Sequence, residues 1–168
     1  KNFILVYPQG ALLEKYSHWN AGLKSESNKS QIDDFGFIEA LIDKIAEQYK
    51  IDTKRVYATG YSNGGFFAYA LACFYSDRIA AVGSVASTMM EETYNSCNPN
   101  HPKAIIHIHG TSDYVVPYAG GKGLKSIEDT LSYWKKHNKS SQDPSSKTHK
   151  TSEGITIEHH TYAGGTNN

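Results

Sequence analysis

A single serine stands among glycines at the point where a strand-like run gives way to a helix-like run. The run Arg55–Thr59 is short, β-branched and aromatic, which is typical of a strand, whereas Phe66–Cys73 is alanine-rich and too long for one. The connecting residues 60–64, Gly-Tyr-Ser-Asn-Gly, fit the pattern G-x-S-x-G, in which a sharp strand-to-helix turn exposes a serine hydroxyl. Such a turn strains the serine backbone, and glycine relieves the crowding around it. The pattern therefore predicts strands that alternate with helices, and Ser62 as a candidate nucleophile.

Composition limits the class of protein. The chain has 168 residues, of which 39% are hydrophobic, and this predicts one domain with its own core over residues 1–168. The formal net charge is zero and the basic residues are scattered, so the chain lacks the basic footprint of a nucleic-acid-binding protein. No apolar run approaches the roughly 18 residues that a membrane-spanning helix needs. We therefore expect neither a nucleic-acid nor a membrane partner.

The remaining hydrophobic pattern predicts further strands and helices in alternation, as in a parallel sheet covered by helices. The expected strands are residues 3–7, 79–85, 103–109 and 155–162. Asp33 and Asp34 predict the start of a helix that ends near Lys50, and a second helix is expected over residues 126–137, with Ser126 and Asp129 as a capping pair. Polar loops are expected over residues 24–30 and 140–152.

A second candidate residue follows the strand expected at residues 103–109. Asp113 lies in the loop after that strand, and catalytic groups of open α/β sheets gather at the carboxyl ends of strands. A serine nucleophile needs a histidine to take its proton, and the histidine needs a carboxylate to fix its tautomer. The order Ser62 and then Asp113 matches the chain order Ser, Asp/Glu, His of this architecture. Asp113 is therefore the candidate acid.

Three ordered blocks together carry a family resemblance. They are DDFGFIEALID, IDTKRVYATGYSNGGFFAYALA and HIHGTSDYVVPYAGG, and they resemble the bacterial polyhydroxybutyrate depolymerase/feruloyl esterase-like group of α/β-hydrolases. The resemblance implies an α/β-hydrolase fold, a mostly parallel sheet with helices on both faces. It also implies a serine esterase, secreted or periplasmic, that needs no cofactor. Its substrates would be carboxylic esters, including polymeric ones: polyhydroxyalkanoates, or feruloyl or acetyl esters of polysaccharides.

The same resemblance assigns roles to residues. It implies that Ser62 is the nucleophile, that Asp113 is the acid, and that the backbone N–H of Asn63 supplies half of the oxyanion hole. The group's second oxyanion loop and its glycine-rich histidine segment have no counterpart here, so the fold is expected to be incomplete at both ends. The catalytic histidine is expected beyond Asn168, with His159 and His160 as weaker alternatives. The 168 residues alone are therefore expected to be inactive.

The cysteines and the other histidines have simpler interpretations. Cys73 and Cys97 are either two buried thiols or one disulfide, and the second alternative gains support because the group often has a cysteine at the position of Cys97. His107 and His109 are expected to brace a buried strand and its loop. The histidine spacing matches no metal site. Two alternatives to the esterase stay open: a peptidase of the same fold, and a non-catalytic binding domain or pseudo-enzyme that keeps the fold without a full triad.

Overall fold

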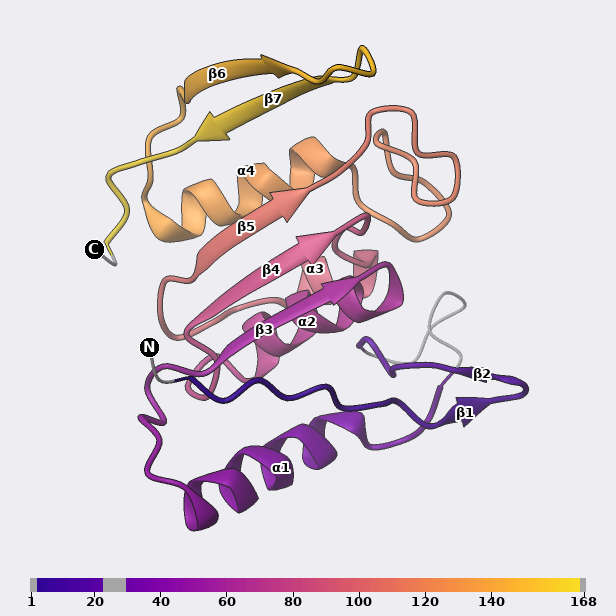
Figure 1. Ribbon diagram of the computed structural model, residues 1–168, viewed down its shortest axis with the longest axis vertical. Helices are drawn as coiled ribbons and strands as arrows, with labels where there is room; N and C mark the ends of the chain where they lie inside the picture. The colour runs from indigo at the N-terminus through magenta and orange to yellow at the C-terminus, as the bar shows by residue number, and fades with distance from the viewer. Residues whose placement is uncertain (1–2, 23–29, 167–168) are drawn as a thin grey trace.

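The computed structural model describes residues 3–22 and 30–166, and its centre is a parallel three-stranded sheet. The strands are β3 (Tyr57–Tyr61), β4 (Ala81–Val85) and β5 (Ala104–Ile108), in the order β3-β4-β5 (Figure 1). Tyr61 pairs with Val85, and Val85 with Ile108, so the three strands end level at one edge of the sheet. The predicted α/β class is confirmed, and each of these strands lies within two residues of its predicted position.

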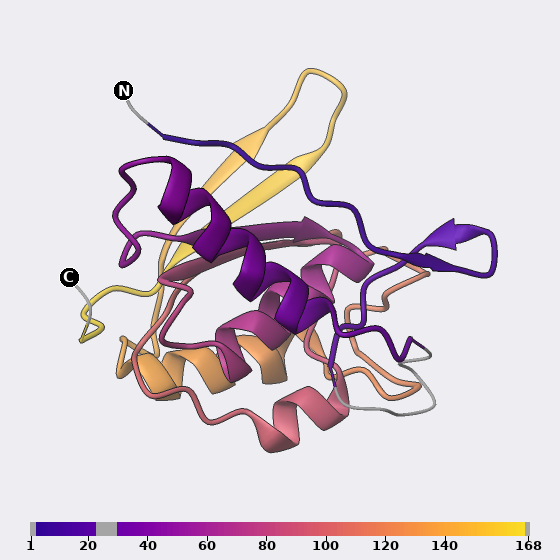
Figure 2. The same cartoon turned by 90° about the horizontal axis from the view of Figure 1, so that it is seen from below.

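In the part of the chain that the structure describes, four helices accompany the sheet: α1 (Asp34–Gln48), α2 (Asn63–Phe74), α3 (Glu91–Ser96) and α4 (Ile127–Asn138). Helices α2 and α4 lie on the same side of the sheet, as Figure 2 shows. Helix α2 is buried along most of its length, and Tyr69, Ala70 and Ala72 in its middle have no exposed surface. Small side chains let the helix approach β3 and β4 closely, which explains why its sequence is rich in alanine and hydrophobic all round.

The two predicted helix starts are confirmed by their caps. The Asp33 carboxylate accepts a hydrogen bond from the Gly36 N–H at 2.9 Å, and α1 begins at Asp34, directly after the cap. The Ser126 hydroxyl accepts from the Asp129 N–H at 3.0 Å at the start of α4. Both caps satisfy N–H groups that the first turn of a helix leaves without an intrahelical partner.

The sheet has a second face, from which large side chains project into solvent. Side chains alternate between the two faces of a strand. Ala58, Val82 and Ile105 point toward the helices, whereas Tyr57 and Ile106 on the opposite face are exposed, as are Tyr61 and Ile108.

Two sequence predictions fail at the ends of the chain. Residues 3–7 form no strand and are exposed, and their backbone makes no hydrogen bond with other described residues. The prediction failed because an apolar pattern identifies a candidate strand but does not show whether a partner strand is present. The polar loop expected over residues 140–152 contains strand β6 (Ser145–Lys150), which pairs antiparallel with β7 (Thr156–Thr161) in a separate hairpin. Both strands are exposed on both faces, so no hydrophobic alternation marked β6.

The N-terminal part of the chain adds a small hairpin that the sequence did not predict. Strands β1 (Leu12–Leu13) and β2 (Tyr16–Ser17) pair antiparallel, and Figure 1 places this hairpin at the edge of the molecule toward which β3 points. Of the loop expected over residues 24–30, all but the last residue lies outside the described residues.

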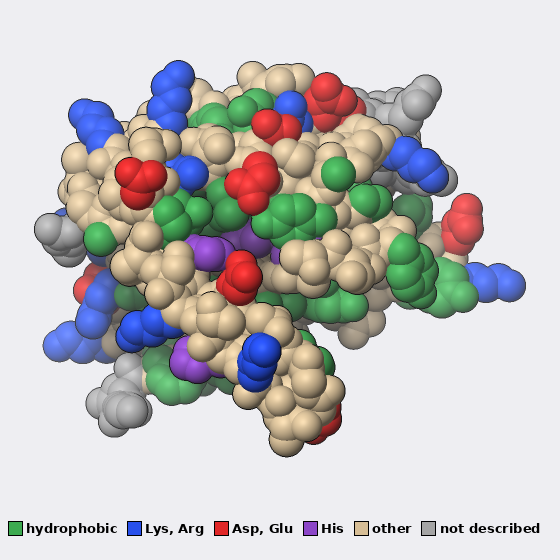
Figure 3. Space-filling model, turned by 90° about the horizontal axis from the view of Figure 1, so that it is seen from above, with side chains coloured by type: hydrophobic (Ala, Val, Ile, Leu, Met, Phe, Trp, Pro, Cys, Tyr) green, Lys and Arg blue, Asp and Glu red, His purple; other side chains and the backbone are tan. Residues whose placement is uncertain are grey.

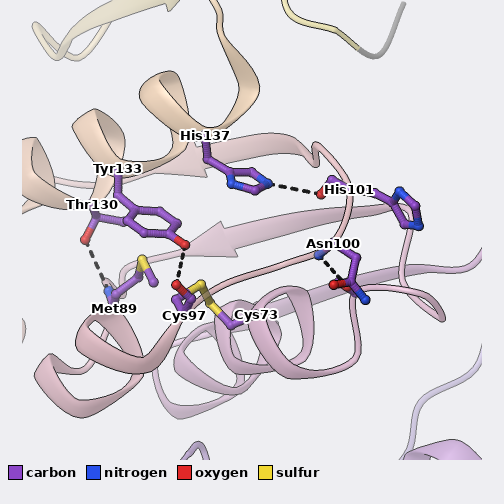
Figure 4. Close-up of a disulfide and its surroundings, with 9 residues drawn as sticks. Cys73, Met89, Cys97, Asn100, His101, Thr130, Tyr133 and His137 are labelled. Atoms are coloured by element: carbon purple, nitrogen blue, oxygen red, sulfur yellow. Dashed lines mark hydrogen bonds between the residues drawn. A yellow bond between two sulfur atoms is a disulfide. The ribbon is translucent and has the colours of Figure 1, made fainter.

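A disulfide joins α2 to the segment after α3. Cys73 and Cys97 are bonded, with their Cα atoms 4.9 Å apart (Figure 4). The Tyr133 hydroxyl of α4 donates a hydrogen bond to the Cys97 carbonyl at 2.8 Å, so the same segment also holds α4. Of the two alternatives for these cysteines, the structure thus has the disulfide.

The surface carries no dominant charge on the face shown in Figure 3, where acidic and basic side chains are interspersed. This pattern agrees with the zero formal net charge of the chain. Among the described residues, no helix is both long enough and apolar enough to cross a membrane.

Candidate active site

Ser62 lies in the tight turn between β3 and α2, with a backbone φ of 51°. Its N–H donates to the Val85 carbonyl at 2.9 Å, which attaches the turn to β4. Its own carbonyl accepts from the N–H groups of Gly65 at 2.9 Å and Phe66 at 3.1 Å, the first hydrogen bonds of α2. A positive φ is unfavourable for a residue with a side chain, so the bonds on both sides hold the serine in a strained conformation.

Two of the flanking glycines are required by close contacts. A Cβ atom at Gly60 would lie 2.1 Å from the carbonyl of Gly64, and one at Gly65 would lie 2.4 Å from the Ser87 hydroxyl oxygen. The prediction that glycine relieves crowding in the turn is therefore confirmed at these two positions. It is wrong at Gly64, where a Cβ atom would meet no atom within 4 Å.

Asn63 is the first residue of α2 and contributes both its backbone and its side chain to the site. No described residue accepts a hydrogen bond from its N–H group. The side-chain Oδ1 accepts from the Trp19 N–H at 2.7 Å, and Nδ2 donates to the Trp19 carbonyl at 3.1 Å. Nδ2 also lies 3.3 Å from Nε2 of His18. The Asn63 amide therefore joins the serine turn to a segment 44 residues earlier in the chain.

Sequence reasoning missed the role of His18, because nothing local signals a contact across such a separation. Burial lowers the pKa of His18, while the Asp34 carboxylate acts in the opposite direction. The neutral ring offers the Nε2 lone pair to the Asn63 amide, so the contact belongs to the uncharged form.

Asp113 lies in the loop after β5 with one carboxylate oxygen fixed. Its Oδ1 accepts from the N–H groups of Val115 and Val116, at 2.9 Å each. The hydrogen bonds from Val116 and then Val115 lower the pKa of Asp113, because they stabilise the charged form. The other oxygen, Oδ2, lies 3.9 Å from Nε2 of His109, which is beyond hydrogen-bonding distance. The carboxylate is thus ionised at neutral pH, with one oxygen fixed and the other open.

The two histidines of β5 and its following loop brace their surroundings, as expected, but β5 itself is exposed on one face, and one nitrogen of each ring has no hydrogen-bond partner among the described residues. His109 donates from Nε2 to the Val116 carbonyl at 2.9 Å and so steadies the loop that carries Asp113. Nδ1 of His107 shares a hydrogen bond with the Tyr69 hydroxyl of α2, at 2.7 Å. Burial lowers the pKa of His107 to about 4, and the neighbouring His109 adds to the effect.

The strand order brings Ser62 and Asp113 to the same edge of the sheet. They follow β3 and β5, with β4 between, and two strand spacings amount to about 10 Å. The described residues place no histidine nitrogen within hydrogen-bonding distance of the Ser62 hydroxyl. His159 and His160 lie on the separate hairpin, where His160 Nδ1 is 2.8 Å from the Ser146 hydroxyl. The structure therefore does not bring either of these two histidines to Ser62 or Asp113.

The titratable side chains of the described residues also form no group of three or more that would hold a metal ion.

Comparison with known proteins agrees with this geometry. The phospholipase/carboxylesterase family matches residues 17–161 of the chain. A bifunctional acetylxylan esterase/xylanase of Neocallimastix patriciarum is 34% identical over 131 residues, which is 77% of this chain and 17% of that protein. Feruloyl esterase B of Piromyces equi is 32% identical over 70% of this chain and 22% of its own length. A probable feruloyl esterase C of Aspergillus oryzae is 36% identical over 72% of this chain and 39% of its own length.

The chain thus spans well under half the length of the curated relatives that it matches. The resemblance to the feruloyl esterase-like group of α/β-hydrolases is nevertheless confirmed, because the family match covers residues 17–161 and the feruloyl esterases named above are 32% and 36% identical over the stretches that they match. The chain belongs to the phospholipase/carboxylesterase family of α/β-hydrolases.

Proposed function

We propose that the protein is a serine ester hydrolase in which Ser62 is the nucleophile. The observation that carries the proposal is the conformation of Ser62, held at a φ of 51° between β3 and the start of α2. In the reaction, the Ser62 oxygen bonds to the ester carbonyl carbon as a base takes its proton, and the alcohol leaves with a proton. Water then attacks the acyl-enzyme and releases the acid.

The Asn63 N–H is the proposed donor to the oxyanion. It has no acceptor among the described residues and lies at the N-terminus of α2, where the helix dipole favours negative charge. A donor that is already aimed at the developing charge stabilises the transition state without reorganisation.

Asp113 is the proposed acid that orients the catalytic histidine. Its two backbone hydrogen bonds fix the carboxylate and keep it ionised, and its Oδ2 is left to accept from an imidazole N–H. His159 and His160 bond within their own hairpin instead. We therefore expect the 168 residues alone to hydrolyse esters no faster than the same chain with Ser62→Ala, because a serine hydroxyl without a base is a weak nucleophile.

The names of the relatives support a class of substrate. Those proteins are named acetylxylan and feruloyl esterases, and we propose that this protein cleaves acetyl or feruloyl esters of polysaccharides, with polyhydroxyalkanoates as a further polymeric candidate. The chemistry requires no cofactor. The Cys73–Cys97 disulfide supports a location outside the cytoplasm, since disulfides persist in oxidising compartments.

The test uses the full-length gene product and a fluorophosphonate probe, with the adduct mapped by mass spectrometry. We expect the probe on Ser62, and we expect Ser62→Ala to abolish the hydrolysis of both p-nitrophenyl acetate and methyl ferulate. Labelling of another serine in an active enzyme would refute the assignment.

A non-catalytic binding domain is the second candidate, favoured by the absence of a histidine contact to Ser62 among the described residues. It predicts no labelling and no ester turnover by the full-length gene product. A peptidase of the same fold would cleave a matched peptide amide as well as the ester, and Ser62→Ala would abolish both activities.

A further inference from the structure

The base of the β1–β2 hairpin is attached to the serine turn through one side chain. The Asn63 amide makes the two hydrogen bonds with the Trp19 backbone, at 2.7 and 3.1 Å, and the third contact with His18. Because Asn63 directly follows Ser62, any movement of residues 18 and 19 is transmitted to the edge of the site. The hydrogen bonds leave the Asn63 N–H, the proposed oxyanion donor, unused.

The hairpin itself is closed tightly at this base. The His18 N–H donates to the Ala11 carbonyl at 2.9 Å, and the Ser17 hydroxyl donates to the Gly10 carbonyl at 2.8 Å. A Cβ atom at Gly10 would lie 2.4 Å from the His18 carbonyl oxygen, so the segments that enter and leave the hairpin approach as closely as glycine allows. The position of the hairpin therefore follows the position of His18.

Packing fixes the same segment from the other side. The Trp19 ring stacks on Phe67 of α2, with 5.1 Å between ring centroids, and on Phe37 of α1 at 6.3 Å. The next residue, Asn20, donates its N–H to the buried Asp34 carboxylate at 2.6 Å. The segment is thus held by both helices, while the hairpin beyond it projects with Leu12 and Tyr16 largely exposed, Tyr16 at 79%.

We propose that the Asn63 side chain is a positioning group that holds the β1–β2 hairpin beside Ser62 as a wall for the non-reacting part of the ester. Leu13 and Tyr16, which pair across the hairpin and therefore share one of its faces, give this wall an apolar and aromatic surface, which suits a large or aromatic acyl group. A small acyl group such as acetyl does not reach it. The inference rests on the proposed function, because it assigns the hairpin to the substrate of Ser62.

The experiment compares Asn63→Ala with the wild type in the full-length gene product. The variant keeps the backbone N–H and loses all three side-chain contacts. We expect kcat/KM for methyl ferulate to fall about tenfold relative to kcat/KM for p-nitrophenyl acetate, mainly through KM, because the wall is displaced while the reacting groups stay. Asn100→Ala is the matched control. Asn100 precedes β5 and lies at the opposite edge of the sheet, where its amide donates to Asp77. The ratio of kcat/KM for the two esters in this variant should equal that of the wild type.

The outcomes separate the two proposals. An unchanged ratio in Asn63→Ala, with Ser62→Ala inactive, overturns this inference alone. An equal loss for both esters also overturns it, because Asn63 then acts on catalysis or folding rather than on the fit of the substrate. Hydrolysis by Ser62→Ala overturns the proposed function and this inference with it.

A second variant tests the contact with His18. Asn63→Asp keeps the acceptor for the Trp19 N–H, loses the donor to the Trp19 carbonyl, and places a carboxylate oxygen where Asn63 Nδ2 now lies, 3.3 Å from Nε2 of His18. The new charge adds to that of Asp34, the carboxylate that already favours protonation of His18. We expect the pKa of His18, followed by NMR, to lie below 6.5 in the wild type and to rise in the variant. An unchanged titration would overturn the proposed attachment.

Discussion

Removal of the Cys73–Cys97 bond should cost the protein a large part of its stability. The two cysteines are 24 residues apart in the sequence, and the chain-entropy relation for a loop of this length gives about 3.4 kcal/mol at 25 °C. Small domains are stable by only about 5–15 kcal/mol. The double variant Cys73→Ala/Cys97→Ala should therefore fold, but with its free energy of unfolding lowered by about 3 kcal/mol.

Urea unfolding monitored by near-UV circular dichroism measures this loss. With a slope of about 2 kcal/mol per molar urea, the midpoint should fall by roughly 1.5 M. Wild-type protein kept in dithiothreitol is the control, because it retains both sulfur atoms in the core and lacks only the bond. A midpoint shift under about 0.5 M in both samples would refute the reasoning, since the bond would then restrict the unfolded chain very little.

Three further predictions concern the sheet and its loops. In the full-length gene product, Asp113→Asn should keep the loop, because the amide oxygen still accepts from Val115 and Val116. It should lower kcat for ester hydrolysis about a thousandfold or more through loss of the histidine tautomer, with Ser62→Ala as the baseline. Gly60→Ala should lower the free energy of unfolding by more than about 2 kcal/mol in urea, because its Cβ meets backbone 2.1 Å away; Gly64→Ala, with open space, is the mild control. The pKa of His107 is lowered to about 4 in the folded protein, so between pH 6.5 and pH 4 the unfolded chain gains a proton that the folded protein does not accept. The free energy of unfolding should therefore be highest above pH 6.5 and fall by about a few kcal/mol toward pH 4. A flat stability profile between these pH values would exclude His107 as a source of acid sensitivity.

The serine turn and the central sheet could be predicted from the sequence because their signals are local. Gly60 and Gly65 reflect close contacts, within the turn and with Ser87 just after β4. The switch from a β-branched run to an alanine-rich run marks β3 and α2 directly. The capping residues Asp33 and Ser126 act within three residues of their own position. Interactions of this range leave a readable pattern in the sequence.

The contacts of Asn63 could not be predicted, because the partner of an amide 44 residues away is set by the tertiary fold alone. Residues 3–7 show the converse difficulty, since an apolar run predicts a strand only where a neighbouring strand can pair with it. The polar strand β6 was missed because its partner is another exposed strand, and neither face needs hydrophobic side chains.

The exposure of the β6–β7 hairpin also has a consequence for local unfolding of the molecule. A two-stranded hairpin with both faces in water has little stability of its own, and here its exit is tethered through the bonds from Ser141 to Ala163 and from Thr166 to Asn138. Its amide protons should exchange with solvent long before those of β4, and trypsin should cut first at Lys147 or Lys150. The sheet and the serine turn would survive this nick, so the hairpin is the segment of the described chain best suited to carry an inserted tag.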